Sequence, residues 1–395
     1  MLQQRNEMPT VLGRAVERLF PKRQWIGLVA VGLFAGLAAL GTVLPAHAED
    51  PAPGAATFGE VVLEAAPKNV YMESDTRLWY TLPTVDKLAL VDGAAVTYYP
   101  VDGDAVNNSE PYDLVVQDGA VWFTMLAANK IGKLDIASGN VTTYPIPTAD
   151  SHPTGITFGG GYVWFVERTG DKLGQLDRAS GTITEYYDWV RDPDTDKNLV
   201  DMKGAQLEDV AYVAGNVWFT GPTLYLGGAD LYNPGTGKWV ASPNNSQTGT
   251  ASAPMQISSD SLGNVWVTFS GLNYIGRSAL NTLSVWDAYV LPASTSGPVG
   301  LYVREANGVR ELWYTRPSAN SIGRVATRYN GVTVSTWETP LPTAGAAPWG
   351  ITVESDGTAW AATSNAAKSV SWNAPYYSFF LRVPLLLCND GPCTQ

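Results

Sequence analysis

Histidine and cysteine, which most often hold metals or move protons in proteins, are scarce in this chain. The 395 residues include two histidines, His47 and His152, and two cysteines, Cys388 and Cys393. His47 falls in an apolar N-terminal segment, which leaves His152 alone in the body of the protein. Zinc, copper and haem sites need several His or Cys ligands, so we expect no such cofactor.

The two cysteines flank a short turn close to the end of the chain, with the sequence Cys-Asn-Asp-Gly-Pro-Cys. Asn, Asp, Gly and Pro are typical turn residues, and paired cysteines outside the cytoplasm are usually oxidised. No neighbouring group would lower a thiol pKa. We therefore interpret Cys388 and Cys393 as a disulfide loop in a C-terminal tail, residues 385–395.

A loop in the middle of the chain carries alternating aspartates, Asp192, Asp194 and Asp196. Alternating carboxylates can bind calcium, but an EF-type loop needs a glycine and a glutamate where this chain has Lys197 and Lys203. A solvated acidic loop is the favoured interpretation. A calcium or magnesium site is the weaker alternative.

Three further residues are weak candidates for proton transfer. Glu110 and Tyr112 flank Pro111 and could form an acid–base pair or bind a ligand; the favoured interpretation is a loop carboxylate and an aromatic residue lining a channel. His152 is best explained as an exposed loop histidine, because one unpaired histidine makes no acid–base pair.

The elements that must position these residues follow an internal repeat of a tryptophan within a short apolar run. Its seven copies recur at intervals of about 40 to 55 residues, at Trp79, Trp122, Trp164, Trp218, Trp266, Trp313 and Trp360. Each copy lies among short β-branched and aromatic runs separated by Gly, Asn and Asp turns, which indicates four strands per repeat. We predict an all-β, seven-bladed β-propeller over residues 58–384.

Closure of the ring has two candidate strands. Residues 58–64 resemble an orphan fourth strand that could complete the last blade, and residues 378–383 could fill the same place. The sequence does not decide between them.

The first 48 residues indicate export. A basic stretch precedes an apolar run from Trp25 to Ala46, which ends in Ala46-His47-Ala48. This pattern predicts a secretory signal peptide, or an uncleaved anchor helix because the run is long enough to cross a bilayer. Residues 49–57, rich in Ala and Pro, are expected to be a linker. Either way the body of the protein is expected to be extracytoplasmic, in contact with a membrane only through an uncleaved segment.

The surface charge excludes one class of partner. The formal net charge is −12, and it becomes more negative without the basic N-terminal segment. Nucleic acids need a basic footprint, so we expect no nucleic-acid binding.

The repeats resemble the streptogramin lyases, the virginiamycin B lyase family, over roughly residues 58–384 and most strongly in blades two, three and six. The resemblance rests on Asn129-Lys130-Ile131-Gly132-Lys133-Leu134-Asp135, on residues 141–148 and 153–157, and on a second copy at residues 172–177 and 183–186. It implies a seven-bladed propeller whose ligand-binding rim lies where each innermost strand enters the channel. The rim positions include Tyr112, Thr154, Met255, Val299 and Trp349.

The resemblance also implies a chemistry, the opening of a cyclic depsipeptide at its ester by elimination. Family lyases have Glu-Pro-His-Gly-Ile in the last blade and Pro-His-Ala-Ile in the preceding one. Here residues 347–351 read Ala-Pro-Trp-Gly-Ile, residues 297–301 read Gly-Pro-Val-Gly-Leu, and a further family glutamate aligns near Ser364. Trp, Val and Ala cannot transfer protons near neutral pH.

The sequence therefore favours a non-catalytic, exported propeller that binds a protein partner or a small ligand through its loops and channel rim. A subunit of a cell-envelope or membrane-associated assembly is one form of this role. The alternative is a diverged lyase that acts on a cyclic depsipeptide or a related ester.

Overall fold

The computed structural model describes residues 57–101, 108–187, 189–191, 198–222, 230–240, 252–278, 286–292, 297–306 and 308–373. Several expectations lie outside these residues: the N-terminal segment 1–48, nearly all of the linker, the candidate closing strand 378–383, the cysteine tail and the three aspartates of the acidic loop. In the described part, no helix is long and apolar enough to cross a membrane.

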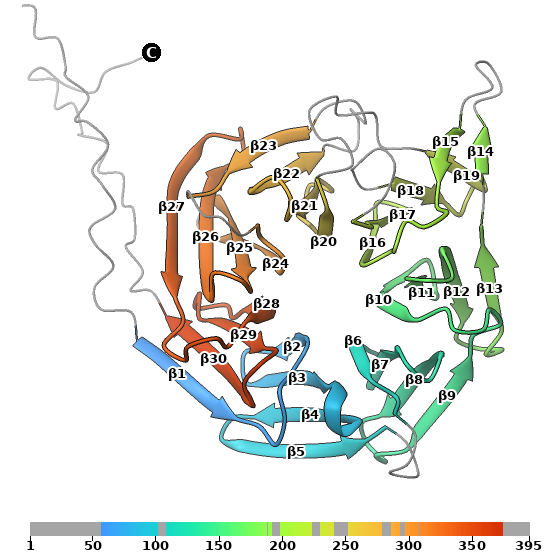
Figure 1. Ribbon diagram of the computed structural model, residues 1–395, viewed down its shortest axis with the longest axis horizontal. Helices are drawn as coiled ribbons and strands as arrows, with labels where there is room; N and C mark the ends of the chain where they lie inside the picture. Colours follow the sequence, from blue (N-terminus) through green and yellow to red (C-terminus); the bar gives the residue numbers. More distant parts are fainter. Residues whose placement is uncertain are drawn as a thin grey trace, which may run out of the picture. The chain divides into compact units, whose positions relative to one another are not determined.

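Seven four-stranded antiparallel sheets follow one another around a ring (Figure 1), and a separate two-stranded sheet follows the third blade in the sequence and lies next to β19 of the fourth. Within blades 1 to 6 the strands pair in sequence order, from the innermost to the outermost. The all-β, seven-bladed propeller predicted from the tryptophan repeat is therefore confirmed. The predicted four strands per blade are present as well.

The bounds of the strands of blades 1 to 3 are as follows: β2 Val70–Ser74, β3 Arg77–Leu82, β4 Lys87–Asp92, β5 Ala95–Pro100, β6 Pro111–Gln117, β7 Ala120–Met125, β8 Lys130–Asp135, β9 Val141–Pro145, β10 Pro153–Gly159, β11 Tyr162–Glu167, β12 Lys172–Asp177 and β13 Ile183–Tyr186. The extra sheet pairs β14 Trp189–Arg191 with β15 Asn198–Asp201, and a 3₁₀ turn, η1, covers Pro83–Val85.

The bounds in blades 4 to 7 are β16 Val210–Val213, β17 Asn216–Phe219, β18 Asp230–Asn233, β19 Lys238–Val240, β20 Pro254–Ser259, β21 Val265–Phe269, β22 Tyr274–Ser278, β23 Trp286–Val290, β24 Leu301–Ala306, β25 Val309–Arg316, β26 Ser321–Arg328, β27 Thr333–Pro340, β28 Pro348–Val353, β29 Ala359–Thr363, β30 Lys368–Asn373 and β1 Thr57–Val62.

The N-terminal strand closes the ring. β1 pairs antiparallel with β30, so blade 7 takes its outermost strand from the start of the described chain (Figure 1). The register sets Thr57 opposite Asn373 and Val62 opposite Lys368. Of the two closing strands that the sequence left open, the N-terminal one holds this place. It begins at Thr57, the last residue that we assigned to the linker.

The core lies between the blades. Buried apolar residues form clusters that each join neighbouring sheets; one contains Trp164 and Phe219 from blades 3 and 4, and another Trp313 and Trp372 from blades 6 and 7. Six of the seven repeat tryptophans are at most 2% exposed, and Trp360 is partly exposed. The repeat thus marks the residue that each blade buries against the next.

Glycine in the third strand makes room for an aromatic side chain of the second strand. Gly132 in β8 lies opposite Phe123 in β7, and a Cβ at Gly132 would meet the Phe123 ring at 2.2 Å. Gly174 relates to Phe165 in the same way in the next blade. The missing side chain is the space that the aromatic ring fills.

Candidate functional site at the ring axis

A β-bulge marks the start of the innermost strand in several blades. The register shifts between Pro111 and Leu114 in β6, and at the equivalent places in β10, β20 and β28. Bulges re-aim side chains and are common beside functional sites. Here the bulge takes two residues of each strand out of the ladder, and the first of them is the rim position that the sequence identified.

Threonine hydroxyls fix these bulges to the preceding blade. Thr81 Oγ1 donates to the Tyr112 carbonyl oxygen at 3.0 Å, and Thr315 Oγ1 donates to the Trp349 carbonyl oxygen at 2.6 Å. Thr268 makes the same bond to Val299 at 2.7 Å. Because each bond ties a rim residue's backbone to its neighbour blade, the rim is a rigid part of the ring.

The second bulge residue caps the ladder with its side chain. Asp113 accepts from the backbone N–H of Leu114 at 2.8 Å and from that of Ile156, in the next blade, at 3.1 Å. Asp209 repeats this arrangement in blade 4. Burial is the main cause that raises the pKa of Asp113 to about 7, and these N–H donors oppose the rise. These carboxyls hold the rim in place.

Five side chains from different blades meet at the axis, and we call them the axial cluster: Lys68, Tyr112, Arg168, Glu208 and Trp349. The Tyr112 hydroxyl donates to Glu208 Oε1 at 2.7 Å and accepts from Arg168 Nη2 at 2.8 Å. Arg168 also forms an ion pair with Glu208, which is 6% exposed. Burial raises the pKa of Tyr112 well above its ordinary value, so this hydroxyl stays protonated.

Lys68 completes the cluster from the other side. Its Nζ lies 3.0 Å from the centroid of the Trp349 ring and 4.9 Å from that of the Tyr112 ring. Burial lowers the pKa of Lys68 to about 7; the Glu208 charge opposes this shift and the Arg168 charge adds to it. The axis therefore holds one guanidinium, one amine whose charge changes near pH 7, one carboxylate and two aromatic faces.

The structure separates the remaining predicted residues from this cluster. Glu110 has φ 48°, its N–H donates to Asp86, and its carboxylate accepts from Asn108 Nδ2 at 3.0 Å. His152 has φ 51° and its Nδ1 contacts Thr169 Oγ1 at 2.7 Å. Among the hydrogen bonds of the described residues, neither side chain reaches the axial cluster.

The other rim positions are mainly structural. Thr154 is fully buried and donates to the Leu207 carbonyl oxygen at 2.9 Å. Val299 is 8% exposed, and Met255 is partly exposed. Of the five predicted rim residues, Tyr112 and Trp349 are the two that belong to the axial cluster.

Sequence reasoning missed Lys68, Arg168 and Glu208. Lys68 follows Pro67 as Tyr112 follows Pro111, and this signal could have placed it on the rim. Glu208 follows a leucine instead, which hides the same alignment. Arg168 comes from the turn after β11, and nothing in the repeat marks it.

A buried carboxyl lies beside the cluster. Glu167 immediately precedes Arg168, is 0% exposed, and neither of its carboxyl oxygens has a hydrogen-bond partner among the described residues. Its neighbour Glu185 accepts from Lys172 Nζ at 2.8 Å and from the Thr148 N–H at 2.8 Å. Burial, and then the Glu185 charge, raise the pKa of Glu167 to about 8.

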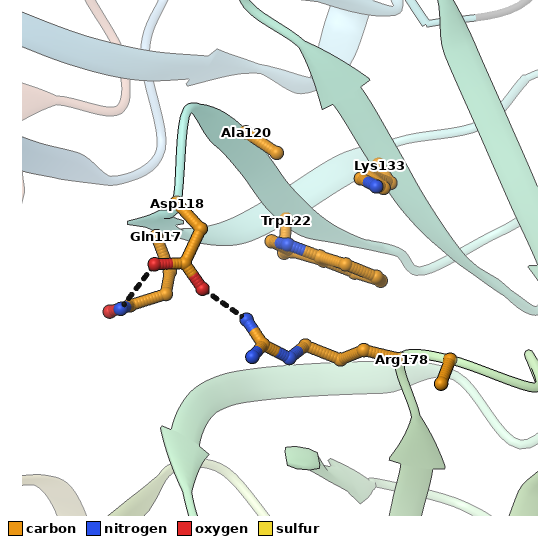
Figure 2. A pocket seen from close by; sticks show the side chains of 7 residues that line it. Gln117, Asp118, Ala120, Trp122, Lys133 and Arg178 are labelled. Atoms are coloured by element: carbon orange, nitrogen blue, oxygen red, sulfur yellow. Dashed lines mark hydrogen bonds and ion pairs between the residues drawn. The ribbon is translucent and has the colours of Figure 1, made fainter. Parts of the chain in front are cut away.

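A shallow pocket of about 270 Å³ lies at the other end of β6, between blades 2 and 3. Figure 2 shows Trp122 beside the Asp118–Arg178 ion pair, whose atoms are 2.6 Å apart, with Lys133 on the neighbouring strand. Gln117 donates to Asp118 at 3.1 Å. Asp118 is 62% exposed, so this pocket is open to solvent.

The fold and its axial cluster make this chain a seven-bladed propeller with side chains of five blades in contact at the axis, and comparison with known proteins identifies its sequence relatives. Residues 53–222 match the virginiamycin B lyase family. A streptogramin B lyase structure is 28% identical with a TM-score of 0.68, covering 81% of this chain and 98% of that chain. The chain thus carries a virginiamycin B lyase-like propeller, as its repeats predicted.

Two further structures place the fold more broadly. A catalytically inactive virginiamycin B lyase from Staphylococcus aureus, solved with quinupristin, is 23% identical with a TM-score of 0.68, covering 81% of this chain and 100% of that one. The extracellular domain of a proposed one-component system from B. thetaiotaomicron is 15% identical with a TM-score of 0.57, covering 81% of this chain and 40% of that one. No curated protein matches the sequence.

Proposed function

We propose that this chain is an extracytoplasmic, non-catalytic propeller that binds a ligand at the axial cluster. The observation that carries the proposal is the way the charged groups of the cluster are satisfied. Arg168, Glu208 and Tyr112 are bound to one another by an ion pair and two hydrogen bonds. Such a closed network is a fixed surface for recognition and does not present a free acid–base pair.

The chemistry of the cluster favours a ligand with a flat ring and an acidic group. Trp349 and Tyr112 offer aromatic faces on which a ring can stack. Arg168 and the protonated form of Lys68 together outnumber the carboxylate of Glu208, in a chain whose net charge is −12. A carboxylate or phosphate on the ligand would find its complement there.

Elimination chemistry has less support. Trp349 and Val299 stand where the family resemblance places catalytic histidines, and the other acid–base candidates, Glu110 and His152, bond to loop residues Asn108 and Thr169. The proposed extracytoplasmic location of the protein rests on the export pattern of the N-terminal segment. The extracellular domain among the similar structures fits this location.

Calorimetric titration of the purified propeller with benzoate, and with benzyl alcohol as the uncharged match, tests the binding role. We expect benzoate to bind more tightly. Trp349→Ala should weaken binding about tenfold through loss of the stacking face. Arg178→Met, which alters only the pocket of Figure 2, is the matched control and should bind like the parent.

Two outcomes would overturn the proposal. Equal binding by the parent and Trp349→Ala would remove the axial cluster as the site. Opening of quinupristin by the purified protein, with or without magnesium, would show that the propeller is an enzyme, as the lyase alternative holds.

A protein partner bound through the loops is the second form of the binding role. A separate measurement distinguishes a protein partner from a small ligand. The native size of the protein, isolated from its own cells in mild detergent, should be that of a single propeller if the ligand is small. A large particle of fixed composition would instead identify a subunit of an envelope assembly, with its partners named by mass spectrometry.

A further inference from the structure

Lys68 differs from other lysines of the propeller in its surroundings. Lys172 Nζ is paired with Glu185 at 2.8 Å, and Lys368 Nζ with Glu60 at 2.8 Å. Lys68 Nζ makes no hydrogen bond or ion pair with any described residue, and it lies against the ring of Trp349 at 3.0 Å from the centroid. Its side chain is still partly exposed, so a small molecule can reach the amine.

Burial and one like charge disfavour the charged form of this amine, whereas the faces of Trp349 and Tyr112 and the Glu208 carboxylate favour it. Burial has the largest effect, and the guanidinium of Arg168 adds a like charge. Glu208 opposes them, but its carboxylate is engaged by Arg168 and Tyr112. A lysine that is desolvated and close to another cation is the arrangement that activates an amine for nucleophilic attack.

We propose that Lys68 is a nucleophilic lysine that forms an imine with small aldehydes and ketones at the ring axis. The neutral Nζ attacks the carbonyl carbon, and a proton moves from nitrogen to the former carbonyl oxygen to give a carbinolamine. The C–O bond then breaks, the nitrogen loses its remaining proton, and one water leaves as the C=N bond forms. This goes beyond the binding role and does not depend on it, because it concerns one amine and an added electrophile.

The surroundings also define which carbonyl compounds react best. The faces of Trp349 and Tyr112 lie 3.0 Å and 4.9 Å from the amine, measured to the ring centroids. A carbonyl carbon carried on a flat, apolar group can stack there while it is attacked. An aromatic aldehyde such as benzaldehyde should therefore react faster at Lys68 than its solution reactivity toward free lysine predicts.

Competitive labelling of the whole protein tests the proposal. The chain is treated with a limiting amount of formaldehyde and cyanoborohydride, which traps the imine as a methylamine, and each lysine is quantified by peptide mass spectrometry. At pH 7 an ordinary lysine is only about 0.04% neutral, against about half of Lys68. We expect Lys68 to be labelled at least about tenfold faster than Lys172, whose side chain is 26% exposed. The advantage should fade toward pH 10.5.

A variant and the benzoate titration separate reactivity from folding and from binding. Lys68→Arg removes the primary amine, so position 68 should no longer be labelled. Arginine keeps a positive charge there, so an unchanged melting temperature would show that the ring is intact. Labelling of Lys68 no faster than Lys172 at pH 7 would overturn the proposal, whatever the benzoate titration shows. Fast labelling without benzoate binding would retain it and reject the binding role alone.

Discussion

At the scale of single residues, the chain buries charged groups close to its axis instead of only apolar ones. A carboxyl or an amine removed from water shifts its pKa toward the neutral form. Glu167 and Lys68 both follow this rule, with pKa values of about 8 and about 7. Both residues should therefore be visible in how the stability of the protein changes with pH.

Glu167→Gln tests the buried carboxyl. Between its ordinary value of 4.5 and about 8, the folded state keeps a proton that the unfolded state releases. Stability therefore falls as pH rises through this window, by up to about 1.4 kcal/mol per pH unit for one group. The variant lacks this loss, so its melting temperature should exceed that of the parent at pH 8.5 more than at pH 5. Glu305→Gln serves as a control for removing a partly buried carboxylate. A constant difference across the range would contradict the assignment.

The sequence predicted some of the residues of the axial cluster but not all of them. Tyr112 and Trp349 could be placed on the rim because they follow Pro111 and Pro348 in a recurring motif. Arg168 could not, because a turn residue reaches the axis only through the path of the loop. The pairing of Arg168 with Glu208 joins blades 3 and 4, and a single repeat carries no information on such contacts.

At the scale of elements, the repeat encodes more than strands. The apolar run with tryptophan gives the second strand, and the Asp118-Gly119 pair, with φ 52° and 73°, gives the hairpin before it. The bulges and the threonine bonds recur at fixed positions in several blades, so they too are written in the repeat. They were not predicted, because periodicity alone shows a strand and not a register shift.

Gly132→Ala tests the packing of the third strand. The new Cβ would meet the Phe123 ring at 2.2 Å, so strand or ring must move, at a cost of about 1–3 kcal/mol. Chemical denaturation measures the loss. In the double variant with Phe123→Leu the two effects should be less than additive, because the smaller side chain leaves room. Full additivity would mean that the two residues do not compete for space.

Thr268→Val tests the bond between blades 5 and 6. The valine keeps the shape but removes the donor to the Val299 carbonyl oxygen, which is 2.7 Å away. We expect a loss of about 1 kcal/mol in the free energy of unfolding. Thr268→Ser, which keeps the hydroxyl, should recover most of it. If valine were as stable as the parent while serine were destabilised, methyl packing and not the hydrogen bond would be the contribution of Thr268.

At the scale of the whole molecule, one strand pairing between distant parts of the described chain closes the ring, and contacts between blades 7 and 1, such as Tyr80 Oη to Ser369 Oγ at 2.9 Å, support it. The N–H of Gly59 donates to Ser371 Oγ at 3.1 Å, and Lys368 pairs with Glu60 at 2.8 Å. Seven blades could be counted from the sequence, because each copy of the repeat is local. The segment that closes the ring could not be predicted from the sequence, because both candidates were short apolar runs of similar character.

Removal of β1 tests the closure. A chain of residues 50–395 keeps the strand, and a chain of residues 64–395 lacks it. We expect the shorter chain to melt at a much lower temperature and to self-associate, since β30 becomes an unpaired edge. Addition of a synthetic peptide of residues 57–63 should restore part of the loss. Equal melting temperatures for the two chains would show that blade 7 is stable with three strands.

The β1–β30 pairing also determines when, during synthesis of the chain, the ring can close. Gly59 and Ser371 are separated by 312 positions, so the first strand to emerge from the ribosome must wait for nearly the last one. Earlier blades can form from contiguous segments as they appear, whereas the final seal requires a long-range encounter of the kind that slows folding. The polypeptide therefore remains open during most of its synthesis, and its circle is completed only when the last blade is available to receive β1.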